Sequence, residues 1–421
     1  MLKGVWYVII FLVFASCSND RLKDGQWRGV FHIQESNDSV NQLFCNSVIS
    51  SSEIPFIFEV RAAKTIRPIV TLINGEDSFV LTDVTYRNDS VIIPIKIYDA
   101  ALETKIVGKR MSGRLVKHYS NRPDGRVPFT AQKGALSRFT DTHEKPTVSL
   151  NGLWEITVPD RNNEKQVGIF SQRADGYLTG SILTTTGDYR YLEGVVQDNC
   201  FYLSAFAGLT PYFIQGQFTD TNNFNAEFVT PASRTHFEGV RNHYATLPND
   251  SYNVTKLKHG YTSLDFRLPA FDGREVSLSD PKYRDKVVVV TLLGSWCPNC
   301  LDEASFLAPW YKANRKRGVE VVGLAFERKD DIDYARNQLS VFIEKFNITY
   351  DILFAGKANN ETVAKVLPEL TELMSYPTTI FIDKKGRVRK IHSGFSGPAT
   401  GKFYEEFKKD FNKNVNELIA E

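Results

Sequence analysis

The stretch VVVVTLLGSWCPNC, residues 287–300, decides the fold of the C-terminal part of this 421-residue chain. Its first half, residues 287–293, is an unbroken apolar run, which is typical of a β-strand buried on both faces of a sheet. An amphipathic pattern follows to about Arg317 and predicts a helix. Cys297 and Cys300 therefore fall between a buried strand and the first turn of a helix.

Strands and helices continue to alternate beyond this point. Further strands are predicted at 319–326, 379–383 and 387–391, the last two as a hairpin that turns at Lys385-Gly386, and helices at 331–346 and 403–419. This order predicts an α/β sandwich for residues 260–421.

Several motifs in this region are similar to a known family. The Trp-Cys-x-x-Cys motif at residues 296–300 and the later YPTT, residues 376–379, resemble the thioredoxin fold. The segments 264–280 and FIDKKG, residues 381–386, resemble the TlpA-like branch of extracytoplasmic disulfide reductases. This resemblance, over about residues 260–415, implies an enzyme without a cofactor that reduces disulfides of extracytoplasmic proteins, apocytochromes among them. A membrane thiol donor would then reduce it again.

The position of the two cysteines predicts their roles in thiol–disulfide exchange. A thiolate attacks a disulfide, and a helix N-terminus favours the negative sulfur of Cys297. We expect Cys297 to be the exposed nucleophile and Cys300 to resolve the mixed disulfide, which closes a Cys297–Cys300 bridge. The resemblance further implies that Pro377 is a cis-proline and that it lines the substrate-binding surface with Trp296 and Tyr376.

Two acidic residues are candidates for the site. Glu303 matches a family glutamate that is implied to manage the proton of the second thiol, and Thr291 stands where ordinary thioredoxins have a buried Asp. The alternative for Glu303 is an exposed residue that counters the helix dipole. Glu327 ends the second strand, where a solvated strand end is the favoured interpretation and a place at the border of the site is the alternative.

Other chemistries for a Cys-x-x-Cys pair fit less well. Zinc needs two more Cys or His ligands, and the nearest later candidate is His392. Haem attachment requires His where Leu301 stands. A peroxidase would want Thr or Ser at Gly294, so neither a metal site nor antioxidant activity is expected. Pro298 occupies the first rather than the second place between the cysteines, which leaves the reduction potential open.

The N-terminus predicts export and a lipid anchor. Lys3 precedes an apolar run over residues 5–14, which is shorter than the about 20 residues of a membrane span. FASC, residues 14–17, then resembles the lipobox of bacterial lipoproteins. We expect a signal peptide over 1–16, lipidation of Cys17, a tether over 17–24, and a periplasm-facing protein on the inner or outer membrane. An ordinary cleaved signal and a short uncleaved anchor remain alternatives.

The middle of the chain predicts an all-β region of two related antiparallel subdomains, residues 25–140 and 150–245, joined by a linker over 246–259 to the thioredoxin fold. Both subdomains open with Gly-x-Trp, at Trp27 and Trp154. Up-and-down barrels that hold small ligands share this opening, but a buried core Trp is the favoured interpretation. Cys45 and Cys200 are candidates for a bridge, although a free buried thiol at Cys200 is favoured.

Charge and composition narrow the function. Lys and Arg number 51 and Asp and Glu 49, so the chain lacks the basic excess of a nucleic-acid-binding protein. The leading hypothesis is a thiol–disulfide oxidoreductase that acts as a reductase. The alternatives are an oxidant or isomerase with the same cysteines, and a lipoprotein whose β-region binds a ligand or partner as its main function.

Overall fold

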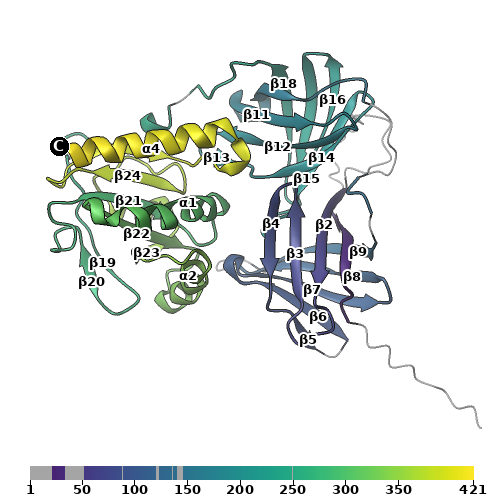
Figure 1. Ribbon diagram of the computed structural model, residues 1–421, viewed down its shortest axis with the longest axis horizontal. Coiled ribbons are helices and arrows are strands. Elements are labelled where there is room, and N and C mark those ends of the chain that lie inside the picture. The colour runs from purple at the N-terminus through teal and green to yellow at the C-terminus, as the bar shows by residue number, and fades with distance from the viewer. Residues whose placement is uncertain are drawn as a thin grey trace, which may run out of the picture.

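The structure, a computed structural model, describes residues 21–33, 52–87, 89–119, 123–134, 136–139, 146–248 and 250–421. The predicted signal peptide, Cys17 and Cys45 lie outside the described residues. Within the described part of the chain, no helix combines the length and the apolar character needed to cross a membrane. Two β-sheets form one side of the molecule and a mixed α/β unit forms the other (Figure 1).

The first sheet is antiparallel and open. Its strands follow the order β4-β3-β2-β1-β9-β8-β7-β6-β5. The strands are β1 (Gly25–His32), β2 (Glu53–Arg61), β3 (Ile69–Asn74), β4 (Asp77–Leu81), β5 (Thr85–Arg87), β6 (Ser90–Ile95), β7 (Ala100–Val107), β8 (Arg110–Lys117) and β9 (Gly125–Lys133), with a 3-10 turn η1 (Lys96–Tyr98).

The second sheet closes into a barrel. Its order is β11-β10-β18-β17-β16-β15-β14-β12-β13, and an additional pairing of β11 with β12 completes the ring. The strands are β10 (Gly152–Val158), β11 (Glu164–Gln172), β12 (Tyr177–Thr184), β13 (Gly187–Asp188), β14 (Leu192–Gln197), β15 (Cys200–Ala205), β16 (Tyr212–Asp220), β17 (Asn223–Val229) and β18 (Arg234–Arg241).

The two sheets are related, as their Gly-x-Trp openings predict. In each, the first strand pairs with both the second and the last strand. Gly25 and Gly152 both have a positive φ, of 113° and 107°, which favours glycine. Trp27 and Trp154 are both fully buried, and each donates its indole N–H to the carbonyl four residues earlier. The two tryptophans are therefore core residues, which confirms the favoured interpretation.

The barrel supplies part of the core that the open first sheet lacks. Phe206, in the loop after β15, packs against Phe31 and Phe56 with ring centroids 4.8 and 5.3 Å away. The side chain of Asn74 exchanges two hydrogen bonds with the backbone of Phe206, at 3.1 and 3.0 Å. These contacts join both sheets into one β-region.

Cys200 differs from the favoured expectation of a free thiol. It is disulfide-bonded at the start of β15. Cys45, the partner that the sequence analysis considered for it, lies outside the described residues. A buried cysteine in a strand carries no local signal that separates a free thiol from a bridged one, so the sequence could not decide between them.

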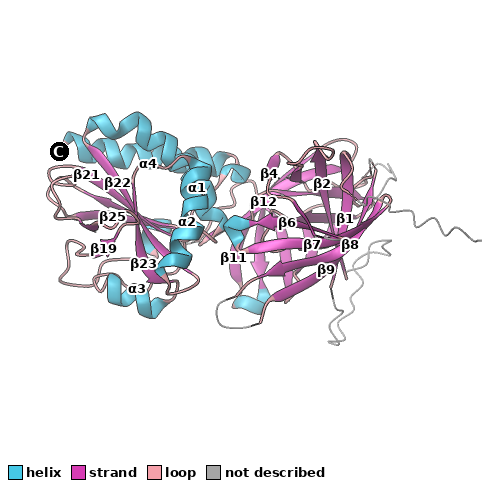
Figure 2. Cartoon of the chain, turned by 90° about the horizontal axis from the view of Figure 1, so that it is seen from below, coloured by secondary structure: helices cyan, strands magenta, loops and turns pink. Residues whose placement is uncertain are grey.

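The C-terminal part has the predicted thioredoxin fold, with helices on both faces of a five-stranded sheet (Figures 1 and 2). The sheet order is β23-β22-β21-β24-β25, with β21 parallel to β22 and antiparallel to β24. Its strands are β21 (Val287–Leu293), β22 (Val319–Glu327), β23 (Asp351–Lys357), β24 (Thr378–Ile382) and β25 (Val388–Ser393), beside a small hairpin of β19 (Arg267–Pro269) and β20 (Glu275–Ser277). The helices are α1 (Pro298–Asn314), α2 (Ile332–Phe346), α3 (Asn360–Val366) and α4 (Lys402–Ala420).

Candidate active site

The two cysteines lie where the sequence analysis placed them, at the start of α1. Cys297 is the N-cap residue of the helix, and its Sγ accepts a hydrogen bond from the backbone N–H of Cys300 at 3.3 Å. Pro298 follows at the first helical position, where a missing N–H costs nothing. Both thiols are free. Burial and the neighbouring Cys297 raise the pKa of the Cys300 thiol well above its usual value.

The expectation that Cys297 is exposed is wrong. Only 6% of its surface is accessible, against 1% for Cys300. The physical reason is that the β-region covers the start of α1. Cys297 lines a cavity together with Tyr98 of η1 and with Arg190 and Leu209 of the barrel.

The predicted substrate-binding residues surround Cys297. The Cys297 thiol donates to the carbonyl of Tyr376 at 3.3 Å, and the Tyr376–Pro377 peptide bond is cis. The Trp296 and Tyr376 rings meet edge to face at 5.7 Å. Trp296 also donates its indole N–H to the carbonyl of Phe326 at 3.0 Å, which fixes the ring beside the cysteine turn.

Glu303 lies in the interior and not on an exposed helix face. It is 3% exposed and accepts a hydrogen bond from each of two hydroxyls, Thr291 and Thr379, both at 2.6 Å. Burial raises the pKa of this carboxyl to about 6, against the opposing effect of the two hydroxyl bonds. The interpretation as an exposed residue that counters the helix dipole is therefore wrong.

Glu327 is also buried, so the favoured interpretation of a solvated strand end is wrong. It is fully buried at the end of β22. Its carboxylate accepts from the backbone N–H of Ser295 at 2.9 Å and from the Ser295 hydroxyl at 2.8 Å. Burial raises its pKa to about 7. Glu327 thus holds the turn that precedes the two cysteines.

A set of contacts from the barrel reaches this site and was not predicted from the sequence. Arg190 binds both carboxylate oxygens of Asp302 on α1, each at 2.9 Å. Asp188 accepts from the backbone N–H of Gly397 at 2.6 Å. With its amide oriented to suit its neighbours, Asn299 donates to the Asp188 carbonyl at 3.2 Å and accepts from the Asp188 N–H at 3.0 Å. Residues 185–190, which we call the covering segment, are therefore bound to the Cys-x-x-Cys turn and to the loop before α4.

The covering segment places charge close to the thiols. Burial, and then the nearby Asp302 carboxylate, raise the pKa of Asp188 to about 7. Arg190 also lies 3.6 Å from Asp77 of the first sheet. One arginine thus connects the first sheet, the barrel and the thioredoxin fold. None of these residues has a local motif, and no pattern in the sequence could have identified them.

The C-terminal part of the chain is similar to known proteins. Residues 260–391 match the AhpC/TSA family. The chain is 30% identical over 151 residues to the thiol-disulfide oxidoreductase ResA of Geobacillus thermodenitrificans, covering 36% of this chain and 78% of that protein. It is 31% identical over 153 residues to ResA of Geobacillus kaustophilus, again covering 78% of the relative. A putative thiol:disulfide interchange protein DsbE from Chlorobium tepidum aligns over 38% of this chain and 99% of its own, with 22% identity and a TM-score of 0.30.

The fold and the pair of cysteines define a thioredoxin-fold thiol–disulfide oxidoreductase. More particularly, the chain belongs to the family of the ResA thiol-disulfide oxidoreductases. The alignments with the two ResA proteins cover 36% of the chain, and the family match covers residues 260–391, which lie outside the β-region.

Proposed function

We propose that the protein reduces disulfide bonds in extracytoplasmic substrates, apocytochromes among them, through a dithiol–disulfide cycle at Cys297 and Cys300. The observation that supports this most directly is the arrangement of the thiols. Cys297 begins α1 and lines a cavity, and Cys300 is buried one turn further along the helix. A nucleophile that meets the substrate and a resolving thiol that cannot meet it need this difference in position.

The cycle transfers two electrons to the substrate. The Cys297 thiolate attacks one sulfur of the substrate disulfide, the substrate S–S bond breaks, and a mixed disulfide forms with release of one substrate thiol. Cys300 then attacks the Cys297 sulfur, which releases the second substrate thiol and leaves the Cys297–Cys300 disulfide. The N–H of Cys300 and the helix N-terminus stabilise the Cys297 thiolate that begins this sequence.

Glu303 is proposed to accept the proton that Cys300 loses when it attacks. A carboxyl with a pKa of about 6 is mostly ionised at neutral pH and can take up a proton without a large cost. Trp296, Tyr376 and Pro377 are proposed to hold the substrate chain beside Cys297.

The cellular setting is part of the same proposal. Lipidation of Cys17 would anchor the protein on the inner or outer membrane, facing the periplasm. A membrane thiol donor would return Cys297 and Cys300 to the reduced state.

Trapping tests the assignment of roles. Cys300→Ser keeps the helix terminus that activates Cys297 but removes the resolving thiol, so substrates should accumulate on Cys297 as mixed disulfides that dithiothreitol releases. Cys297→Ser combined with Cys300→Ser is the control and should trap nothing. If the single variant traps nothing in cells while Cys297 reacts normally with iodoacetamide, the exchange mechanism is wrong.

The reduction potential tests the direction. Equilibration of the full chain against a thiol buffer should give a value near that of thioredoxin, about −270 mV, for a reductase. A value near about −120 mV, as in the strong oxidant DsbA, would instead support the alternative that the protein oxidises its substrates.

A further inference from the structure

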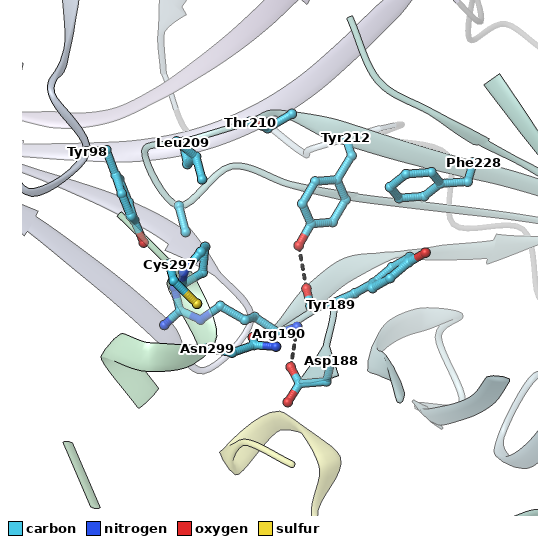
Figure 3. Close-up of a pocket in the computed structure, with 12 residues that line it drawn as sticks. Tyr98, Asp188, Tyr189, Arg190, Leu209, Thr210, Tyr212, Phe228, Cys297 and Asn299 are labelled. Carbon is cyan, nitrogen blue, oxygen red and sulfur yellow. Dashed lines mark hydrogen bonds between the residues drawn. The ribbon is translucent and has the colours of Figure 1, made fainter. Parts of the chain in front are cut away.

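A cavity of about 270 Å³ lies where the open sheet, the barrel and α1 meet (Figure 3). Its walls include Tyr98 of the first sheet, Arg190, Leu209, Tyr212 and Phe228 of the barrel, and Cys297. We call this cavity the chamber. Its volume is just below the about 300–1,000 Å³ of sites for drug-sized ligands, so it suits a small molecule and not a folded domain.

The covering segment occupies the surface on which an extended protein substrate would lie. Asn299, between the two cysteines, pairs with the backbone of Asp188 as a neighbouring strand would. On the opposite side, a β-carbon at Gly394 would lie only 2.9 Å from the backbone carbon of Thr186. Gly394 in turn donates its N–H to the carbonyl of Pro377 at 2.9 Å. The turn of the barrel therefore lies between the Cys-x-x-Cys turn and the loop of Pro377.

Two polar atoms on the chamber wall have no partner in the described part of the chain. They are the hydroxyl of Tyr98, which is 1% exposed, and the Nη1 of Arg190. The Tyr98 hydroxyl lies close enough to interact electrostatically with the Arg190 guanidinium and with the Cys297 sulfur. Figure 3 shows both side chains directed toward Cys297 from different elements. Buried donors are almost always satisfied, so a molecule in the chamber should present acceptor atoms to them.

The charge of the chamber favours a neutral molecule. The guanidinium of Arg190 is already balanced by the bidentate pair with Asp302 and by Asp77 at 3.6 Å. Asp188 also lines the wall, and burial raises the pKa of its carboxyl to about 7. Leu209, Tyr212 and Phe228 contribute apolar surface. An anionic ligand would gain little from a cation that two carboxylates already neutralise.

We propose that the chamber binds a small neutral organic disulfide whose acceptor atoms lie near its sulfur–sulfur bond, and that this class is reduced while the covering segment stays closed. The inference rests on the proposed exchange chemistry of Cys297 and Cys300. The reduced protein and one disulfide R–S–S–R give two thiols R–SH and the Cys297–Cys300 bridge. The two electrons come from the dithiol, which a second dithiol must restore before the next turnover.

The test follows a single turnover of the reduced full-length protein after mixing with bis(2-hydroxyethyl) disulfide. The reaction is monitored by tryptophan fluorescence, or by loss of the protein's own thiols after an acid quench and removal of the small-molecule thiols. The oxidation rate should saturate with disulfide concentration, because binding in the chamber precedes attack. Ala207→Phe places a ring on the chamber wall and should lower the second-order rate at least about tenfold. Ala232→Phe, on an exposed turn of the same barrel, is the matched control and should leave the rate unchanged.

A second pair of variants covers the case in which Ala207→Phe does not fold. Tyr98→Phe removes only the unpartnered donor and should raise the disulfide concentration at which the rate is half-maximal. Tyr86→Phe is its control, because it removes a hydroxyl of the same sheet that does not line the chamber, and it should leave that concentration unchanged. A rate that stays linear in disulfide concentration and does not change in Ala207→Phe or Tyr98→Phe overturns the proposal that the disulfide binds in the chamber. If neither bis(2-hydroxyethyl) disulfide nor insulin oxidises the reduced wild type, the proposed function itself fails. Oxidation by insulin with no effect of the chamber variants refutes this inference alone.

Discussion

Breaking the Arg190–Asp302 pair should make Cys297 accessible to large partners. Asp302 is held by two hydrogen bonds of 2.9 Å from Arg190, and each side chain is only 12% exposed. Asp302→Ala removes the carboxylate on α1 and leaves Arg190 with Asp77 at 3.6 Å as its remaining acidic partner within 4 Å in the described chain. The covering segment would then be held mainly by Asp188 and Asn299.

The size of the effect follows from the burial of this pair. Truncating one partner of a buried, hydrogen-bonded charge pair at an interface costs about 2–5 kcal/mol. We take about 2 kcal/mol, because Asp77 still compensates part of the charge of Arg190 and because both groups gain water when the segment opens. Since about 1.4 kcal/mol corresponds to a tenfold change, the open fraction should rise about 30-fold.

The assay compares two alkylating reagents on the reduced full-length protein. A bulky maleimide on a polymer chain reaches Cys297 only when the covering segment opens, so its rate should rise about 30-fold in Asp302→Ala. Iodoacetamide is small enough for the chamber, and its rate should change far less. Insulin reduction should rise in parallel with the bulky reagent.

Asp351→Ala is the matched control for this experiment. Asp351 is a similarly buried carboxylate, 11% exposed, with ion pairs to Arg274 and Lys282 inside the thioredoxin fold. Its loss should destabilise that unit without changing the ratio of the two alkylation rates. An unchanged ratio in Asp302→Ala, in a variant that melts normally, would refute the reasoning that the ion pair closes the site.

Two buried carboxyls give further predictions. Glu303→Gln should slow the step in which Cys300 resolves the mixed disulfide. It should also remove the limb of the pH–rate profile that rises through pH 6 in the wild type, because only the ionised carboxylate accepts a proton. Stopped-flow kinetics of the wild type and the variant measure both effects, and identical profiles would contradict the role. The pKa of Glu327 is raised to about 7 by burial, so folding favours its protonated form and the stability of the wild type should fall as pH rises from about 4.5 to 7. Glu327→Gln should therefore raise the melting temperature more at pH 8 than at pH 5, and a larger gain at pH 5 would show that the carboxylate is favoured in the fold.

Much of the thioredoxin fold was predictable because its signals are local. The apolar run of β21, both cysteines and the start of α1 lie in one 14-residue stretch, and the N-cap position of Cys297 follows from that order alone. The edge strand β23 and the short helix α3 were not predicted. β23 is an edge strand that pairs along its length with β22 and has only a single bridge, from Leu353 to Ala270, outside this pairing. Its partly buried pattern is less regular than that of a central strand. α3 has only seven residues, too few to show a helical period.

The environment of Cys297 was not predictable, because distant parts of the chain create it. The carboxyl of Glu327 is buried by a turn 32 residues away in the chain, and Asp302 meets Arg190 across 112 residues. Read locally, Glu327 has the character of a solvated strand end and Asp302 that of an exposed residue in the first turns of a helix. Their burial arises only when β22 meets the cysteine turn and the barrel meets α1.

The residues that perform the exchange reaction and the residues that limit access to Cys297 come from different parts of the chain. The match to the thiol-disulfide oxidoreductases covers the sheet, α1 and the two cysteines, which together perform exchange. The residues that limit access to Cys297 come from η1, the covering segment and the loop after β15, all outside that match. A buried core runs without interruption from Phe31 and Phe206 of the β-region to Cys297 and Leu307 of α1. The likeness to known thiol-disulfide oxidoreductases is therefore a guide to the reaction class, but not to the molecules that reach Cys297.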